Sequence, residues 1–233
     1  MTSSSAEDPA FKPENRVPFR YFSWILDSQF QPQIDIERLL DGLDESLAWL
    51  QDPDCTLAWG TLCHLMTNLE QDLSPAELVE MGKNSLQIPT NRVLTVLIRN
   101  TVSLRRSYRW AYQAKTGLVP KMYPPLETEL TETGKQQYRL VMRTKPGLEA
   151  PASIFLVSGG QMISGPRLFG LSDAEVEMHP VERGYEFLIH YPDHKGVLGK
   201  LSDYLSRVFF NTRNMQDLNE SLQSEYRKLE TTL

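Results

Sequence analysis

The sequence predicts an α+β protein: a helical N-terminal half, a ββαββ antiparallel sheet covered by helices, and a long C-terminal coiled-coil helix. The hydrophobic period is helical up to about residue 120 and becomes an alternation from residue 126. From Leu201, apolar-leaning positions recur at alternating spacings of four and three. The predicted divisions are a disordered lead-in (1–17), a helical subdomain (18–120), an α+β subdomain (121–199) and the coiled-coil helix (200–233).

The bulk composition narrows the classes of partner. With 233 residues the chain can bury a sizeable core, and its net charge of −6 argues against a broad nucleic-acid surface or a polybasic membrane anchor. Cys55 and Cys63 are too few and too close for a disulfide framework. The sequence has neither a membrane-spanning apolar run nor a signal-peptide pattern, so we expect a cytoplasmic protein without nucleic-acid or membrane partners.

The helical half shows several helix signals. Residues 18–30 are dense in aromatic and aliphatic side chains and predict a buried first helix. Short helices are expected before Gly42 and before Pro53, and a longer one from about Thr56. Ser74-Pro75-Ala76-Glu77 has Ser at the N-cap, Pro at N1 and Glu at N3, which predicts a helix start. A further helix is expected from about 90 to 115.

The second half changes to strand signals. Leu126 to Met142 alternates around Glu132-Thr133-Gly134-Lys135, and predicts a β-hairpin. A helix is expected from about Ala152 to Phe169, ended by Gly170, followed by a second hairpin around Arg183-Gly184. The four strands are expected to form one antiparallel sheet.

The C-terminal heptads predict a parallel homodimer. Asn219 falls at an a position, where a buried amide pairs across two parallel helices and fixes their register. A long surface helix packed on its own domain is the alternative. The predicted dimer-interface residues are Leu201, Leu205, Val208, Met215, Asn219, Leu222, Tyr226 and Leu229.

Three motifs carry a resemblance to a known group. They are a short helix ending in "LxDPxxxLxW", a helix "LSPxELxExG", and a hinge "GPRLFGLxxAxVE" before a final strand, and the resemblance that they mark covers most of residues 18–210. The chain resembles a bacterial N-terminal sensory region that precedes histidine-kinase or GGDEF output modules, as in two-component systems. Its β-rich half is similar to four-vinyl-reductase-type ligand-binding domains, without the cysteines that some of those carry. The resemblance implies a sensor input and brings no catalytic residues.

Candidate binding residues come from two stretches. Residues 105–112 (RRSYRWAY) interleave arginines with aromatics, and Arg105 and Arg109 share a helix face on which a small anion could bind. The same mixing occurs where arginine stems lie on aromatic rings at the outer end of an amphipathic helix. His64 could serve as an axial haem ligand, although a single His on a mainly apolar helix is more often a boundary residue. All four tryptophans lie in the first 125 residues and predict an aromatic pocket. The candidate ligand-binding residues are Trp59, His64, Arg105, Tyr108 and Arg109.

Other site patterns fail or are absent. Residues 159–167 (GGQMISGPR) match the glycine spacing of a phosphate loop, but Pro166 and Arg167 stand where that loop needs Lys and Ser or Thr. The glycines are then expected to allow close packing of a helix on the sheet. No catalytic triad, paired carboxylates or convergent metal ligands stand out.

We therefore expect a non-catalytic, dimeric sensory or regulatory module that binds a small apolar ligand or a partner and passes the change along its C-terminal helix. A dimerisation or scaffold domain without a ligand, and a haem-based sensor using His64, are the alternatives.

Overall fold

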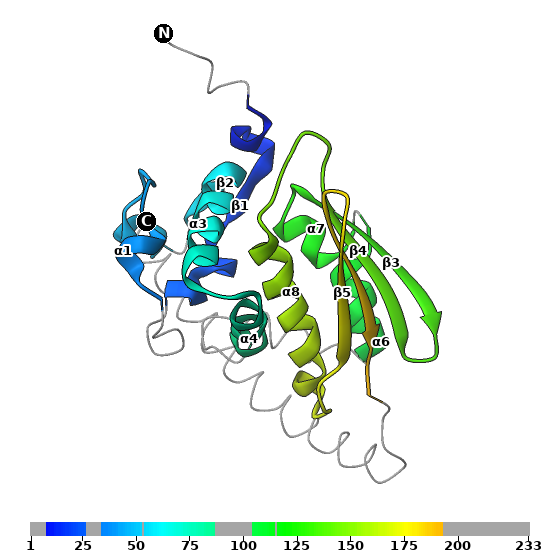
Figure 1. Cartoon of the computed structure of the whole chain (residues 1–233). Helices are drawn as coiled ribbons and strands as arrows, with labels where there is room; N and C mark the ends of the chain where they lie inside the picture. Colours follow the sequence, from blue (N-terminus) through cyan, green and yellow to red (C-terminus); the bar gives the residue numbers. More distant parts are fainter. Residues whose placement is uncertain (1–7, 27–33, 53, 87–103, 115, 193–233) are drawn as a thin grey trace, which may run out of the picture.

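The protein is described by a computed structural model over residues 8–26, 34–52, 54–86, 104–114 and 116–192. Within these residues it is the predicted α+β protein. A group of helices lies beside a four-stranded antiparallel sheet, and the central helix α8 runs between the two (Figure 1). No helix in the described ranges combines the length and apolar character needed to cross a bilayer.

The beginning of the chain is more ordered than its composition indicates. The segment expected to be a disordered lead-in contains, from residue 8 onward, two 3₁₀ turns, η1 (Pro9–Phe11) and η2 (Pro13–Asn15). The Asn15 side chain closes these turns by donating a hydrogen bond to the carbonyl of Pro9 at 2.8 Å. Strand β1 (Arg16–Pro18) then pairs antiparallel with β2 (Thr56–Ala58), so it is a contact across 40 residues that orders the segment.

The expected first helix over residues 18–30 is two 3₁₀ turns within the described residues, η3 (Phe19–Tyr21) and η4 (Ser23–Leu26). Pairing of β1 holds the chain extended up to Pro18, whose fixed φ and missing N–H favour a turn over a continuous helix. The prediction of burial is confirmed, since Phe19, Trp24 and Ile25 are almost fully buried.

The next helices follow their local signals. Asp35 caps α1 (Ile36–Leu39), which closes at Gly42 in the left-handed region (φ 71°), and Ser46 caps α2 (Leu47–Leu50). Helix α3 (Trp59–Asp72) begins three residues later than expected, because residues 56–58 form β2. Helix α4 (Pro75–Ser85) has the predicted capping box of Ser74 and Glu77.

Part of the expected helix over 90–115 is described as α6 (Leu104–Tyr112). A short helix that the sequence did not indicate, α7 (Leu118–Met122), follows it. Both pack against the edge strand β3. Both line the first of the two cavities described below, and Pro120 of α7 lines the second.

The sheet has the order β3-β4-β6-β5 and consists of two hairpins joined through their second strands. Its strands are β3 (Leu126–Gly134), β4 (Gln137–Thr144), β5 (Glu175–Val181) and β6 (Gly184–His190). The first hairpin turns at Lys135 and Gln136, where Gln136 has φ 68°, two residues beyond the expected turn centre. The second turns at Glu182 and Arg183, close to the expected position.

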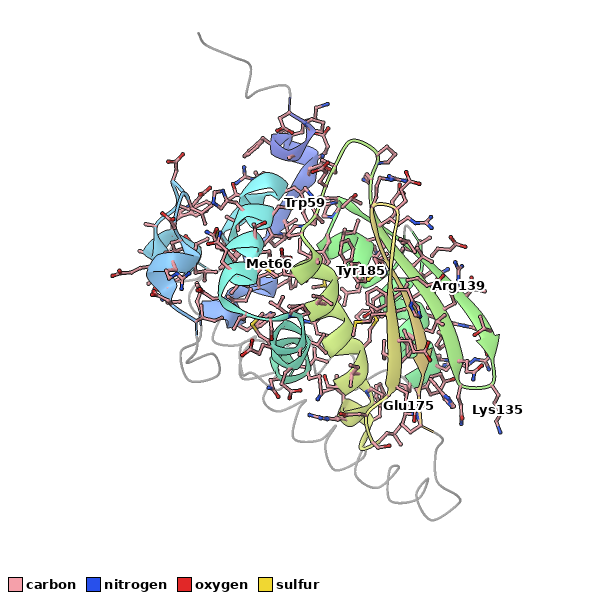
Figure 2. All side chains as sticks on the ribbon, in the orientation of Figure 1. Trp59, Met66, Lys135, Arg139, Glu175 and Tyr185 are labelled. Carbon is pink, nitrogen blue, oxygen red and sulfur yellow. The ribbon has the colours of Figure 1, made fainter. Side chains whose placement is uncertain are left out.

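The two faces of the sheet differ. The inner face carries Leu140, Phe187 and Tyr185 towards α8, and Tyr185 stacks on Phe155 with ring centroids 5.3 Å apart. Arg139 points to the opposite, outer face, where it pairs with Glu186 (Figure 2).

Helix α8 (Ala152–Ser164) continues into η6 (Gly165–Phe169) and ends at Gly170 with φ 73°, as predicted. Its N-terminus is capped from α3: the Glu70 carboxylate accepts a hydrogen bond from the Ser153 N–H at 2.6 Å, and the Ser153 hydroxyl donates to the Met66 carbonyl at 2.9 Å. The prediction that its glycines allow close packing on the sheet holds for Gly159, where a Cβ would overlap the Met178 sulfur.

The predicted coiled-coil helix from Leu201 to Leu233 and its dimer-interface residues lie outside the described residues, as do residues 87–103 of the expected helix over 90–115.

Candidate ligand-binding site

A cavity of about 100 Å³ lies where both halves of the protein meet. Its walls come from η3, the end of α4, helices α6 and α7, and the end of α8 with η6. Elements distant in the sequence therefore line one partly open cavity. The side chains that line it are mostly apolar or aromatic, and include Tyr21, Leu86, Leu104, Tyr108, Ala111, Tyr112, Val119, Met122, Tyr123, Gln161, Met162, Leu168 and Phe169.

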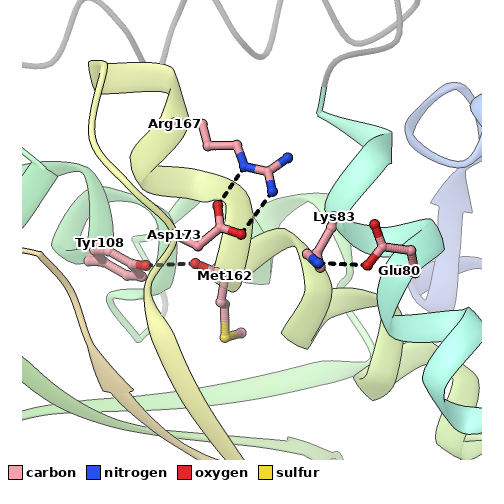
Figure 3. A network of polar contacts seen from close by, with 6 residues as sticks. All are labelled: Glu80, Lys83, Tyr108, Met162, Arg167 and Asp173. Atoms are coloured by element: carbon pink, nitrogen blue, oxygen red, sulfur yellow. Dashed lines mark hydrogen bonds and ion pairs between the residues drawn. The ribbon is translucent and has the colours of Figure 1, made fainter.

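Tyr108 fixes the inner wall of this cavity. Its hydroxyl donates a hydrogen bond to the backbone carbonyl of Met162 at 3.1 Å, joining α6 to α8 (Figure 3). Its ring lies against Tyr138 and Tyr191, with centroid distances of 5.6 and 6.0 Å. Burial raises the pKa of Tyr108 far above its ordinary value, so the phenol stays protonated and remains a donor.

The cavity offers mainly apolar surface because its main polar side chains already have protein partners. The Gln161 amide donates to the Ser85 hydroxyl at 3.0 Å, and the Ser85 hydroxyl donates to the Gly82 carbonyl at 2.8 Å. A dry apolar cavity of about 150 Å³ holds a ligand of the size of benzene or xenon. The geometry suits a small apolar molecule, and the volume is below the roughly 300–1,000 Å³ of sites for drug-sized ligands.

Helix α6 is fastened to the sheet by charges on its outer face. Arg105 and Arg109 share that face, as predicted, and both contact the Glu132 carboxylate on β3, at 2.6 and 2.9 Å. Their hydrogen bonds to the carboxylate hold the pKa of Glu132 below its usual range, and the bond from Arg105 has the largest effect. The anion held by the arginine pair in this structure is thus the protein's own carboxylate.

A second fastening comes from hydroxyl groups. Thr128 on β3 donates to the carbonyl of Tyr112 at 2.9 Å, and the Tyr138 hydroxyl donates to the carbonyl of Arg105 at 3.4 Å. These bonds hold both ends of α6 against the sheet, so they set the position of the cavity wall.

Two other sequence-predicted residues lie away from the cavity. Trp59 is buried at the start of α3, where its indole N–H donates to the Glu149 carbonyl at 2.7 Å. His64 is exposed on the outer side of α3, beside Gly42. Of the five candidate binding residues, Tyr108 lines this cavity, and the other four line neither this cavity nor the second one described below.

The residues present do not form a haem site around His64. Haem needs an axial ligand inside an apolar pocket, and His64 faces outward. His179 and His190 are on the sheet and do not line this cavity. The volume of about 100 Å³ is also small for a macrocycle. Within the described residues, no three His, Cys, Asp or Glu side chains are grouped so as to hold a metal ion.

The two cysteine thiols also lack the features of a reactive or metal-binding site. Burial raises the pKa of Cys55 to about 11 and that of Cys63 to about 12, so both stay protonated at neutral pH. Cys63 donates its S–H to the Glu149 carbonyl, the acceptor that Trp59 also uses. Its environment is that of a packing residue.

Sequence reasoning expected an aromatic pocket and missed which aromatics would form it. The aromatic residues that line the cavity are tyrosines and Phe169, and none of the tryptophans lines it. A usable signal was the recurrence of Tyr108 and Tyr112 four residues apart on one helix face, followed by Tyr123 after Gly117. The contributions of Gln161 and Phe169 depend on the packing of α8 and carry no local signal.

The described residues thus define an α+β domain with an antiparallel sheet, in which the helical half and the central helix line a small apolar cavity. No protein-family model and no curated protein matches the sequence. Among solved structures, the chain is similar to an Fe(II) unliganded H-NOX protein from K. algicida, with a TM-score of 0.50 and 12% identity over 76% of this chain and 95% of that one. At this identity the similarity concerns the fold.

Proposed function

We propose that this chain is a non-catalytic sensory input module, which binds a small apolar ligand in the cavity beside Tyr108 and acts as a homodimer. The observation that carries the proposal is the composition of the cavity wall, which takes residues from η3, α6, α7, α8 and η6. A ligand there contacts both halves of the protein at once, so its binding energy can bias their arrangement. The fold similarity to an H-NOX protein agrees with this function.

The route from the cavity to the C-terminal segment runs through stacked rings. Tyr108 lines the cavity and stacks on Tyr191, which follows β6 directly and precedes the predicted coiled-coil helix. Tyr191 is also held by Tyr138, with centroids 5.8 Å apart, and by a backbone bond to Gln136 at 3.1 Å. A ligand that displaces Tyr108 would therefore also shift Tyr191, which precedes the C-terminal segment.

We further propose that the output is a separate module of the histidine-kinase or GGDEF kind, in keeping with the sequence resemblance. The C-terminal heptads from Leu201 to Leu233 supply the dimer contact and the element that carries the signal. A cytoplasmic location follows from the same proposal, because such output modules act on cytoplasmic nucleotides and proteins.

The proposal is tested by thermal unfolding with benzene, n-pentanol and indole as probes. A ligand that binds only the folded state raises stability by RT ln(1 + [L]/Kd), about 2.7 kcal/mol at 100 times Kd. We expect at least one probe to raise the unfolding temperature, and Ala111→Leu, which fills the cavity, to remove that response.

Gln113→Leu is the matched control, because Gln113 is exposed two residues further along and lines neither cavity. An equal response in both variants would place the probes elsewhere. A flat response of the unmutated protein to all probes would favour a scaffold or dimerisation domain. An absorbance band in the blue in freshly purified protein would instead support the haem-based sensor.

A further inference from the structure

A second and larger cavity, of about 660 Å³, lies at the other side of the α6–α7 connection. Strands β3 and β4 form its floor, and Ala114, Pro120 and Pro124 form an apolar wall. Its volume is within the range of about 300–1,000 Å³ that small-molecule sites occupy. The floor contributes four charged side chains: Glu127, Glu129, Arg143 and Lys145.

Arg143 has a side-chain donor that lacks a hydrogen-bond acceptor among the described residues. Its Nε atom is buried and has no hydrogen-bond partner among the described residues. Glu127 stands directly opposite in the strand register, yet no ion pair joins the two. A buried guanidinium donor without a partner is costly, and native structures usually supply an acceptor from the protein, from water or from a ligand.

The neighbouring Arg139 shows what a satisfied arginine looks like at this surface. It is four residues away on the same strand and points to the same outer face. Its guanidinium contacts the Glu186 carboxylate at 2.5 Å. The difference between the two arginines therefore comes from their surroundings, and Arg143 is the one that borders a cavity.

The charges around the cavity indicate which ligand it suits. Arg143 and Lys145 attract a carboxylate, while Glu127 and Glu129 repel a ligand that is only anionic. A ligand that is only cationic is repelled in the same way by the two basic side chains. A molecule that carries both charges satisfies all four groups, and its apolar part can rest on Pro120.

We propose that this cavity is a binding site for a small zwitterion of the amino-acid class. Its carboxylate accepts hydrogen bonds from Arg143 and Lys145, and its ammonium group donates to Glu127 and Glu129. The site is separate from the cavity beside Tyr108 and does not depend on the function proposed for that cavity. Its carboxylate contacts would be charge-assisted, the stronger class of hydrogen bond.

Calorimetric titration of the full chain tests the assignment. The probes are glycine, L-alanine, L-valine and L-phenylalanine, with propionate and propylamine as the carboxylate-only and ammonium-only analogues. We expect saturable binding of at least one amino acid. Both analogues should bind at least about tenfold more weakly, since each lost charged contact is worth a factor of ten or more.

The variants are Arg143→Gln and Glu127→Gln, each expected to weaken amino-acid binding about tenfold or more. Arg139→Gln is the matched control and is expected to leave the affinity unchanged, because Arg139 does not line the cavity. If Arg143→Gln fails to fold, judged by circular dichroism, Arg143→Lys replaces it and is expected to weaken binding while keeping the charge.

Three results would overturn the proposal. One is the absence of heat with every amino acid at millimolar concentration, which would leave water as the partner of Arg143. Another is an equal loss of affinity in the Arg143 and Arg139 variants. The third is binding of propionate as tight as that of the amino acids, which would rule out a zwitterion.

Discussion

The backbone of Gly160 on α8 lies directly against the carbonyl of Val79 on α4: a Cβ built on Gly160 would overlap that oxygen. The same contact is made in the other direction, since a Cβ on Gly82 would overlap the carbonyl of Val157. The two helices thus touch through their main chains at two glycines. This close approach packs the helical half against α8, the helix that lies on the inner face of the sheet.

Gly160→Ala is therefore expected to destabilise the protein. The added methyl group would meet the backbone of α4, which cannot move aside as a side chain can, and we expect a loss of about 2–3 kcal/mol in the free energy of unfolding. Urea unfolding followed by circular dichroism measures it.

Gly165→Ala is the control for that change. Gly165 has φ −50°, and the nearest heavy atom to a Cβ there is the Tyr108 hydroxyl at 3.9 Å. We expect a smaller loss of stability than at Gly160, since the added methyl group meets no backbone and is opposed only by the preference of a residue before Pro166 against the helical region. Equal losses at both positions would contradict the close helix contact.

The bond between Trp59 and Glu149 supports a second prediction. It ties the start of α3 to the segment that leads into α8, across 90 residues of sequence. Trp59→Phe keeps most of the buried ring and removes the N–H donor, so we expect a loss of about 1–2 kcal/mol in the free energy of unfolding. Chemical denaturation checks this value.

Trp49→Phe is the comparison, because the Trp49 side chain is 38% exposed and that of Trp59 is 1% exposed. A substitution at the exposed site is expected to change stability by about 0.5 kcal/mol or less. If both variants lose the same amount, the indole bond to Glu149 is not what stabilises this junction.

Local signals explain which parts of the fold could be predicted. The capping box at Ser74, the stop at Gly170 and the alternation in both hairpins act within a few residues, so they can be read directly. The pairing of β1 with β2 joins residues about 40 apart, and nothing within residues 16–18 specifies that partner. The helix expected over 18–30 failed for this reason.

The candidate site was harder to predict because it depends on packing between elements. Tyr108 was identified from its arginine-rich surroundings, and its actual role comes from Met162, which is 54 residues away. The arginines beside it were predicted to share a face, and the sequence could not show that Glu132 would reach them from β3. Arg143 was missed altogether, because a lone arginine in a strand has no local mark of an unmet hydrogen bond.

The ion pairs of Glu132 predict a dependence of stability on pH. The folded-state pKa of Glu132 lies below its ordinary value of 4.5, through its bonds to Arg105 and Arg109. A carboxylate with a depressed pKa stabilises the fold fully above its unfolded-state value, and that contribution is lost as pH falls through the folded-state value. Glu132→Gln should therefore be less stable than the unmutated protein at neutral pH, and the difference should shrink below about pH 4.5.

Unfolding midpoints in urea at neutral and acidic pH measure the effect. Glu175→Gln is the control, since Glu175 is exposed on the edge strand β5 and forms no ion pair with another described residue. Its difference from the unmutated protein should be small at both pH values. A Glu132→Gln deficit that persists unchanged in acid would show that the substitution acts through packing.

The last prediction concerns assembly through the C-terminal heptads. Leu222 and Leu229 are at successive d positions of the predicted repeat, where two parallel helices would bury them against each other. Two aspartates there would place charges in the apolar seam, at a cost that a dimer of this length cannot absorb. We expect Leu222→Asp together with Leu229→Asp to turn a dimer into a monomer, measured by light scattering at tens of micromolar protein. Ser224→Asp with Thr231→Asp adds the same charge at outward f positions of the repeat, so this control should remain dimeric. A monomeric unmutated chain would contradict the parallel coiled coil, and a monomeric control would show that charge alone separates the chains.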